Sequence, residues 1–462
     1  MIAIDGGAMF FARPYLSPIQ LKPARRIAKG IGQAMAAMQI RAIGVSPYDL
    51  AAGTDFLVRL AKKNDLSLLS ANLYEDKENT PIFPPYRMIK AGNMTIGCIG
   101  LTGPLSGNRQ QHQYHVLPWQ EVLPAVLKKI DNRADLIILL SSASPQTNRE
   151  IAQKFKNIHI IFQAGQGGGN QPPLNINNTL LCRTASRGKS LGILKVDWGG
   201  TKTWSSNDTD QLIKTQNRLD RLRWQIGRME KRHPQEELRN NLQYQRLVRG
   251  AAELERKLKK LTLQDDNAGT ACRFHNTFIA VETSIPEDKE VKAIVDRTRR
   301  EVNIINRKEQ QKLRQRWEKQ RQSSNNAHQP DPFADMAGSR ICQKCHPIQV
   351  AFYLQTDHAR AWQTLVNKDQ QYNPDCISCH ATLPNYEPDL TSQEALLTTI
   401  PPRLRGVGCE TCHGPARRHS QDPESRVPGK PDANTCLQCH TQKRDKHFNF
   451  TRKTDKIRCP AG

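Results

Sequence analysis

Cysteine and histidine recur at a fixed spacing in the last part of the chain. Four times, two cysteines are separated by two residues and followed directly by a histidine. The cysteine pairs are Cys342 and Cys345, Cys376 and Cys379, Cys409 and Cys412, and Cys436 and Cys439, and the histidines are His346, His380, His413 and His440. Two thiols at this spacing reach the two vinyl groups of one porphyrin, and the histidine binds its iron as the proximal ligand. The pattern predicts four c-type haems.

Zinc is the alternative partner for paired cysteines, because two such pairs form a zinc ribbon. A zinc ribbon has no need for a histidine directly after the second cysteine, yet the histidine is present in all four repeats. Haem is therefore the interpretation that accounts for every residue of the motif. Zinc sites or disulfides are the alternative.

The chemistry of each iron depends on its second axial ligand. Histidine on both faces favours low-potential electron transfer, whereas an open face admits small molecules. The further histidines of this region are His328, His358, His419 and His447. His328 lies in a polar, turn-rich stretch and is interpreted as a surface residue. His447 lies beside a lysine and is either a distal ligand or a surface residue.

Residues 1–206 have the pattern of an α/β domain, in which short apolar runs predict strands and amphipathic stretches predict helices. The strands are expected at Met94–Leu101, Leu136–Leu140, Ile158–Phe162, Thr179–Cys182 and Leu191–Val196, and helices at Pro23–Met38 and Asp55–Lys63.

A basic antiparallel helical hairpin is predicted for residues 207–265. Apolar residues recur there at three- and four-residue steps on both sides of Pro234, which suits the bend between two helices. Between Leu212 and Lys260 there are 14 lysines and arginines against 6 acidic residues. The hairpin is either a solvated outer face or a docking arm for an acidic partner.

The remaining sequence predicts three further segments. A strand at Thr277–Val281 and a helix at about Glu287–Arg321 fall within residues 266–322 and complete the N-terminal domain. Residues 323–339 are polar and rich in turn formers, which is typical of a linker. Residues 340–462 are the haem domain. A segment of this length that carries four haems cannot bury a conventional core. We therefore expect the porphyrins to supply most of the apolar mass and the peptide to be mostly helical or irregular.

The net charge of +24 predicts partners with acidic surfaces. Haem propionates lower this charge to about +20 or +16, depending on the oxidation state, and the protein stays basic. Redox proteins with acidic surfaces are the favoured partners, and self-assembly is an alternative. Nucleic acid is not expected, because haem is attached outside the cytoplasm.

Haem attachment places the protein in the periplasm or outside the cell. Residues 1–30 contain no signal peptide, and the most apolar run, Leu136–Leu140, is far shorter than the ~20 residues of a membrane span. We therefore expect no membrane span, and a start that is truncated and lacks the export signal.

Four stretches between residues 341 and 419 carry a family resemblance. They read Cys342-Gln-Lys-Cys345-His346, Thr356-Asp-His358-Ala-Arg-Ala-Trp362, Asp375-Cys-Ile-Ser-Cys-His380 and Gly406-Val-Gly-Cys-Glu-Thr-Cys-His-Gly-Pro415, followed by His419. They resemble the tetrahaem cytochromes of ammonia-oxidising bacteria, which take electrons from hydroxylamine oxidoreductase. The resemblance implies that His358 is the distal ligand of the third haem (His413) and His419 that of the first (His346).

The same resemblance does not assign the distal ligand of two haems, the second and the fourth. It implies that the second haem (His380) is either filled or five-coordinate, as one haem is in that family. Relatives place a late histidine for the fourth haem (His440) where this chain reads Lys456-Ile-Arg-Cys459-Pro460. Cys459 as a thiolate ligand and His447 in its place are the two candidates, and a spare thiol or disulfide is the alternative for Cys459.

The N-terminal domain resembles the 5′-nucleotidase branch of the calcineurin-like metallophosphatases. The matching stretches include Ile4-Asp-Gly-Gly-Ala-Met-Phe10, Ile43-Gly-Val-Ser-Pro-Tyr-Asp-Leu50, Ser70-Ala-Asn72 and Thr95-Ile-Gly-Cys-Ile-Gly-Leu-Thr102. Where those enzymes hold two metals, this chain reads Gly7-Ala8, Ser46-Pro-Tyr-Asp49, Ser141-Ser142 and Ala164-Gly-Gln-Gly167. Without metal ligands a two-metal phosphate site cannot form, so the domain is degenerate and phosphoesterase activity is not expected. His159 is out of register and is interpreted as structural.

The sequence predicts an exported multihaem cytochrome c that passes electrons, with the N-terminal domain as a non-catalytic scaffold or docking module. One alternative is an oxidoreductase whose open haem, at His380, acts on a small nitrogen or sulfur compound. A second is an N-terminal domain that binds metal or nucleotide.

Overall fold

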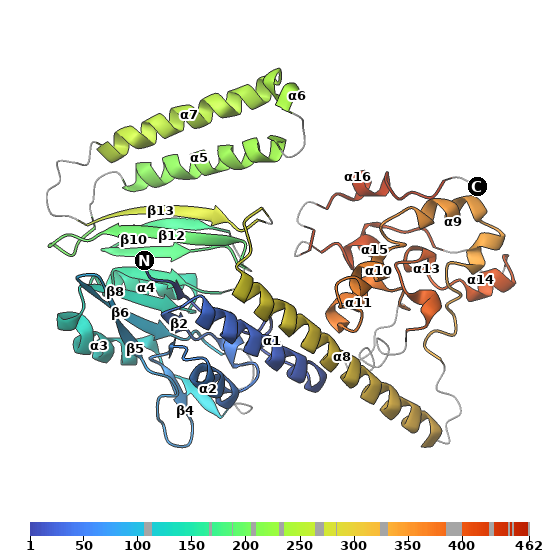
Figure 1. Cartoon of the computed structure of the whole chain (residues 1–462), viewed down its shortest axis with the longest axis horizontal. Helices are drawn as coiled ribbons and strands as arrows, with labels where there is room; N and C mark the ends of the chain where they lie inside the picture. The colour runs from blue at the N-terminus through green and yellow to red at the C-terminus, as the bar shows by residue number, and fades with distance from the viewer. Residues whose placement is uncertain are drawn as a thin grey trace. The chain divides into compact units, whose positions relative to one another are not determined.

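The chain folds into two compact units, the N-terminal unit (residues 1–295) and the C-terminal unit (residues 296–462) (Figure 1). The computed structural model describes all residues except 106–112, 166–168, 187, 205–208, 231–234, 264–271, 283, 324–330, 385–399, 425–428, 442–443, 446–447 and 461–462.

A six-stranded sheet forms the centre of the N-terminal unit. Its strands lie in the order β10 (Gln171–Ile176), β11 (Thr179–Arg183), β9 (Ile160–Gln163), β8 (Leu136–Ser141), β6 (Met94–Leu101) and β5 (Tyr86–Ala91). The four inner strands are parallel, and the edge strands β5 and β10 are antiparallel to their neighbours. Every residue of β8 is buried, as expected for a parallel strand covered on both faces.

The two faces of this sheet carry separate cores, because alternate residues of a strand point to opposite sides. Ile137 and Leu139 of β8 pack on one side with α3 (Trp119–Ile130) and α4 (Pro145–Lys154). Leu136, Ile138 and Leu140 pack on the other side with apolar residues of the smaller sheets.

A second, three-stranded parallel sheet consists of β1 (Ile4–Asp5), β2 (Ala42–Gly44) and β3 (Leu68–Leu69). The helices α1 (Pro18–Ala37) and α2 (Thr54–Lys63) and the short helix η1 (Pro47–Leu50) pack with it. A two-stranded sheet pairs β4 (Leu73–Glu75) with β7 (Tyr114–Val116). The large and the three-stranded sheet approach so closely that a Cβ on Gly100 would clash with the carbonyl oxygen of Leu69.

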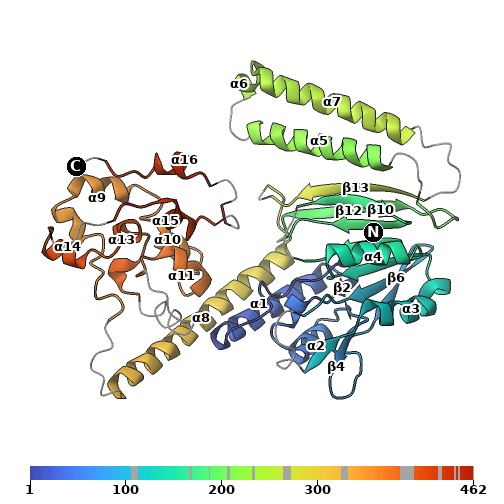
Figure 2. The ribbon, with the colours of Figure 1, turned by 180° about the vertical axis from the view of Figure 1, so that it is seen from behind.

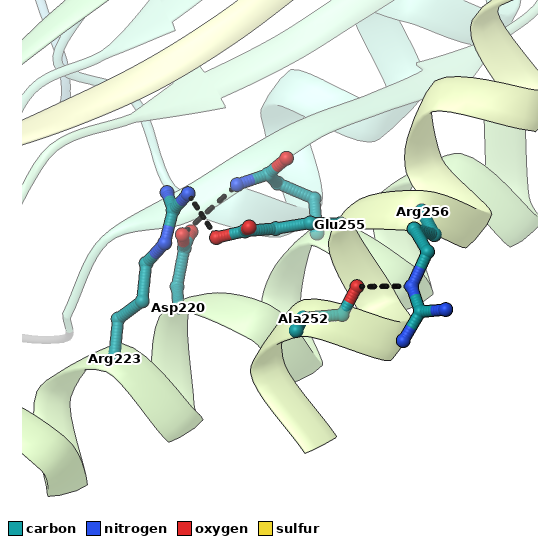
Figure 3. A network of polar contacts seen from close by, with 6 residues as sticks. Asp220, Arg223, Ala252, Glu255 and Arg256 are labelled. Atoms are coloured by element: carbon teal, nitrogen blue, oxygen red, sulfur yellow. Dashed lines mark hydrogen bonds and ion pairs between the residues drawn. The ribbon is translucent and has the colours of Figure 1, made fainter. Parts of the chain in front are cut away.

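The predicted hairpin interrupts a further antiparallel pair of strands, β12 (Ser190–Asp197) and β13 (Arg273–Ala280). Between them, α5 (Thr209–Glu230) and α7 (Leu242–Leu263) lie side by side and antiparallel, joined through α6 (Gln235–Arg239) (Figures 1 and 2). Leu219 and Ala251 are buried in their seam. Figure 3 shows the polar contact across it, in which Arg223 donates to Glu255 at 2.8 Å.

The predicted α/β N-terminal fold with an inserted antiparallel hairpin is therefore confirmed. All five predicted strands form, as β6, β8, β9, β11 and β12, and both predicted helices form, as α1 and α2. The first helix begins at Pro18 rather than Pro23, because Ser17 and Gln20 make a capping box and Pro18 suits the first turn. The sequence prediction missed α3, α4 and the strands β1 to β5, β7 and β10.

The C-terminal unit is mostly helical, as predicted. The 35-residue helix α8 (Lys289–Ser323) runs across the boundary between the units at residues 295 and 296. The other helices are short: η5 (Ile341–Lys344), α9 (Pro347–Leu354), α10 (Ala361–Val366), α11 (Pro374–His380), η6 (Pro402–Leu404), α13 (Cys409–His413), α14 (Arg417–Gln421), α15 (Ala433–Leu437) and α16 (Phe450–Thr454).

The described residues of the C-terminal unit contain a buried apolar cluster. It consists of Phe333, Met336, Leu365, Ile377, Ala381, Ile400 and Leu404. Within the described residues of the whole chain, no helix is both long and apolar enough to cross a membrane.

Candidate functional site

Each cysteine–histidine motif folds as a turn of helix. The amide of His346 donates to the carbonyl oxygen of Cys342 at 2.8 Å, and that of His440 to Cys436 at 2.9 Å. The second motif ends α11 and the third forms α13. Residues three and four apart lie on one side of a helical turn. Both thiols and the imidazole of a motif can therefore face one flat ligand.

Three of the proximal histidines are held through their Nδ1 atoms. His380 Nδ1 lies 2.8 Å from the carbonyl oxygen of Ala361, and His413 Nδ1 lies 2.9 Å from that of Gly429. His440 Nδ1 lies 3.1 Å from a carboxylate oxygen of Asp445. Because these oxygens only accept, Nδ1 carries the proton and the lone pair is on Nε2, which is the arrangement of a metal-binding histidine.

His346 and His419 form one facing pair. Their ring centres are 6.2 Å apart and their planes differ by 24°. Metal–imidazole bonds are about 2.0 Å long, so two such bonds plus the two distances from nitrogen to ring centre give a separation of roughly 6 Å. The pair therefore fits an iron between the two rings. His419 is held by its Nδ1 contact with the carbonyl oxygen of Pro423 at 3.2 Å.

His358 and His440 form a second pair, with ring centres 6.3 Å apart and planes at 61°. This spacing again fits one iron. The structure thus places His358 beside the fourth motif, whereas the resemblance of the sequence implied the third. Burial, and then the neighbouring His440, lower the pKa of His358. A lowered pKa favours the neutral imidazole that a metal requires.

The cysteines of the four motifs lie close to one another, and those of the third motif also interact with those of the fourth. A thiol–thiol hydrogen bond joins Cys342 of the first motif to Cys409 of the third and lowers the pKa of Cys409 to about 6. A second one joins Cys439 of the fourth motif to Cys379 of the second and lowers the pKa of Cys379 to about 6. Groups bound at the first and third motifs, at the second and fourth, and at the third and fourth would therefore lie close together.

Cys459 and His447 are the two sequence candidates for the distal ligand of the fourth haem, and the structure describes only Cys459. Cys459 is exposed, and its electrostatic interactions are with Cys409 and Cys412 of the third motif. Burial is the main cause that raises the pKa of the Cys459 thiol. His447 and the linker residue His328 lie outside the described residues.

Two acidic residues that sequence reasoning missed support the motifs. Glu410, inside the third motif, is buried and accepts hydrogen bonds from the amides of Ala337, Gly338 and Ala416 at 2.7 to 2.9 Å. Asp445 accepts from His440. A buried carboxylate with three amide donors is a stable anchor. The spacing of cysteines gives no signal for either residue.

In the N-terminal unit, three of the stretches singled out by the sequence resemblance, Gly7-Ala8, Ser46–Asp49 and Ser141-Ser142, lie at the carboxyl ends of β1, β2 and β8. The carboxylate of Asp49 accepts hydrogen bonds from the amides of Ala8, Met9 and Phe10 at 2.8 to 3.0 Å and from the amide and hydroxyl of Ser46. Its oxygens are thus engaged with the protein. Among the described residues, no group of three or more histidine, cysteine or acidic side chains could hold a metal ion.

Polar side chains complete this edge by bonding to one another. The Ser70 hydroxyl lies 2.7 Å from that of Thr102, and the Asn72 amide donates to the carbonyl oxygen of Thr102 at 2.9 Å. Asp5, at the end of β1, has a pKa raised to about 6 by burial. His159 accepts from the amide of Ile137, and burial lowers its pKa to about 4. These contacts hold strands to one another.

The haem prediction can now be compared with known proteins. Residues 341–414 match the family model of cytochrome c554 and c-prime. Cytochrome c-554 of Nitrosomonas europaea is 31% identical over 106 residues, which are 19% of this chain and 42% of the relative. The chain thus spans less than half the length of this curated relative. The match confirms the resemblance of the C-terminal unit to this cytochrome family and implies covalently bound haem.

The N-terminal unit resembles solved phosphoesterases in fold. A sulfate thiohydrolase from Thermus thermophilus covers 43% of this chain and 35% of its own, with 19% identity and a TM-score of 0.37. A 5′-nucleotidase precursor from the same species covers 44% and 43%, with 18% identity and a TM-score of 0.35. The calcineurin-like phosphoesterase YfkN from Bacillus subtilis covers 65% and 83%, with 15% identity and a TM-score of 0.41.

Proposed function

We propose that the protein is an exported multihaem cytochrome that passes electrons through four covalently bound haems. The observation that carries the proposal is the facing pair His346 and His419, whose ring centres are 6.2 Å apart, next to a complete attachment motif. The family match over residues 341–414 supports the same function. Attachment of haem outside the cytoplasm supports a periplasmic or extracellular site.

The residues of the chain would bind and orient the cofactor. The eight motif cysteines would form the thioether bonds, and His380, His413 and His440 would present Nε2, because their Nδ1 protons are engaged. When bound, each haem supplies an iron that takes up and releases one electron. The facing histidines close both sides of an iron to small molecules, which favours electron transfer over chemistry on a substrate.

Geometry favours His419 as distal ligand for the motif of His346 and His358 for that of His440. His358 then takes the place for which His447 and Cys459 were the sequence candidates. The alternative, from the resemblance, is His358 on the third iron.

The axial assignments are tested by variants of the holoprotein. His419→Ala and His358→Ala should each open one iron in four, seen as a new high-spin absorption that responds to cyanide. His275→Ala, at an exposed position on β13, is the matched control and should leave the spectrum unchanged. A low-spin spectrum in His419→Ala would contradict its assignment.

Variants that lack one haem distinguish whether His358 binds the fourth iron or the third. In a chain with Cys436→Ser and Cys439→Ser, which lacks the fourth haem, His358→Ala should add no high-spin signal. In a chain with Cys409→Ser and Cys412→Ser it should still do so. The reverse result would return His358 to the third iron.

We further propose that the N-terminal unit is a scaffold or docking module rather than a phosphoesterase. Asp49 stands in a degenerate metal position, and its carboxylate oxygens accept hydrogen bonds from backbone amides. The exposed lysines and arginines of α5 and α7 supply a basic surface for an acidic redox partner. Manganese or nucleotide bound in equilibrium dialysis would contradict the scaffold role.

A further inference from the structure

The motif histidines of the C-terminal unit are held by acceptors of different charge. His380 and His413 donate from Nδ1 to neutral backbone carbonyl oxygens, those of Ala361 and Gly429. His440 instead faces a carboxylate oxygen of Asp445. The difference is chemical rather than one of distance, since all three contacts are between 2.8 and 3.1 Å.

A backbone hydrogen bond joins Asp445 to the residue that directly follows the motif. Its amide donates to the carbonyl oxygen of Thr441 at 2.8 Å, which brings the carboxylate back toward His440 five residues upstream. The side chain of Asp445 is 25% exposed, so water screens the contact only in part. Phe448 stacks on the His440 ring with centres 4.9 Å apart and planes at 22°.

The other polar neighbour of this carboxylate is weaker. Lys453 Nζ lies 3.6 Å from the same oxygen of Asp445, and its side chain is 50% exposed. An exposed ion pair at this distance contributes little. His440 Nδ1 lies closer to that oxygen than Lys453 Nζ does, at 3.1 Å against 3.6 Å.

A carboxylate acceptor changes what His440 does as a ligand. Hydrogen bonds to a charged acceptor are roughly twice as strong as neutral ones. Such a bond draws the Nδ1 proton away and makes Nε2 a stronger electron donor to a metal. A stronger donor stabilises ferric over ferrous iron and so lowers the reduction potential.

We propose that Asp445 positions His440 and depresses the reduction potential at the fourth motif below those at the motifs of His380 and His413. An iron at the fourth motif would then be reduced after the irons at those two motifs and oxidised before them. Electrons would therefore pass from the fourth motif to the other two. This inference rests on the proposed electron-transfer function and adds a direction to it.

The test is a spectroelectrochemical titration of the holoprotein with Asp445→Asn, which keeps the shape and replaces the carboxylate by a neutral amide. One of the four potentials should rise, with about a tenfold change in the ratio of reduced to oxidised iron at a fixed applied potential, or 59 mV for one electron. The other three should stay constant. Asp455→Asn, an exposed position ten residues on, removes the same charge and should change none.

A second variant keeps the inference testable where Asp445→Asn incorporates haem poorly. With Cys436→Ser and Cys439→Ser, the potential that disappears should lie below at least two of the three that remain. Loss of a higher potential, or an unchanged titration in Asp445→Asn with four haems bound, would overturn the inference. A wild-type chain with fewer than four haems would instead refute the proposed function.

Discussion

At the scale of single residues, buried carboxylates in both units serve the backbone. Asp49 accepts from three consecutive amides of the N-terminal unit, and Glu410 accepts from three amides of the C-terminal unit. An amide left without a partner in the interior costs about 1–3 kcal/mol. Each carboxylate therefore fixes a loop beside a candidate site.

Asp5 gives a prediction about pH. Its folded-state pKa is raised to about 6 from 3.8, mainly by burial. The stability that this group provides is thus present below pH 3.8 and is lost as the pH rises through 6. The shift corresponds to about 3 kcal/mol for a fully buried group, and partial exposure of Asp5 reduces this to roughly 2 kcal/mol.

Asp5→Asn should therefore stabilise the N-terminal unit by roughly 2 kcal/mol at pH 7 and by almost nothing at pH 4. The measurement is hydrogen exchange of amides in β1 and β2 of the full chain, corrected for intrinsic rates. Asp131→Asn, at an exposed position, is the control. Equal protection of wild type and Asp5→Asn at pH 7 would show that this carboxyl is not strained by burial.

At the scale of elements, the sequence predicted the strands and helices whose apolar residues form a long run or a clear repeat. Strands β6 and β8 are long apolar runs, and the hairpin helices repeat apolar residues over several turns, so each was found. Strands β1 and β3 have two residues each, which is too short for any period to be visible. They form because each pairs with β2, and that information is not local.

The same limit applies to the candidate site. The eight cysteines and four proximal histidines could be predicted because each motif is complete within five residues. The partner of His358 could not, because it lies far along the chain at His440. Asp445 is close in sequence to His440, but the sequence alone does not show that its carboxylate contacts the ring.

The basic hairpin gives a prediction at this scale. Arg246, Arg249 and Arg256 are exposed on α7, and their combined change to glutamate should weaken binding to poly-L-glutamate about tenfold at low salt, with little effect at high salt. The control changes Lys62, Lys63 and Lys129, which are exposed on α2 and α3, and alters the net charge equally. An equal loss in both variants would mean that net charge alone, and not the hairpin, attracts acidic partners.

At the scale of the whole molecule, two units with different chemistry share one chain. The N-terminal unit has an α/β fold, and polar side chains at the carboxyl ends of its strands bond to one another and to the backbone. The C-terminal unit is mostly helical and carries the four cysteine–histidine motifs. We infer that the redox function belongs to the C-terminal unit and that the N-terminal unit offers surfaces to partners.

The central claim is that this chain carries four haems as an electron carrier. The most direct test is a pyridine-haemochrome count with a ferric absorption spectrum, on protein exported by a host with haem-maturation machinery. We expect four haems per chain, with low-spin iron wherever two histidines face each other. A chain exported without haem would contradict the account and favour zinc at the cysteine pairs. Four haems with every iron high-spin would contradict the axial pairs and favour an enzyme.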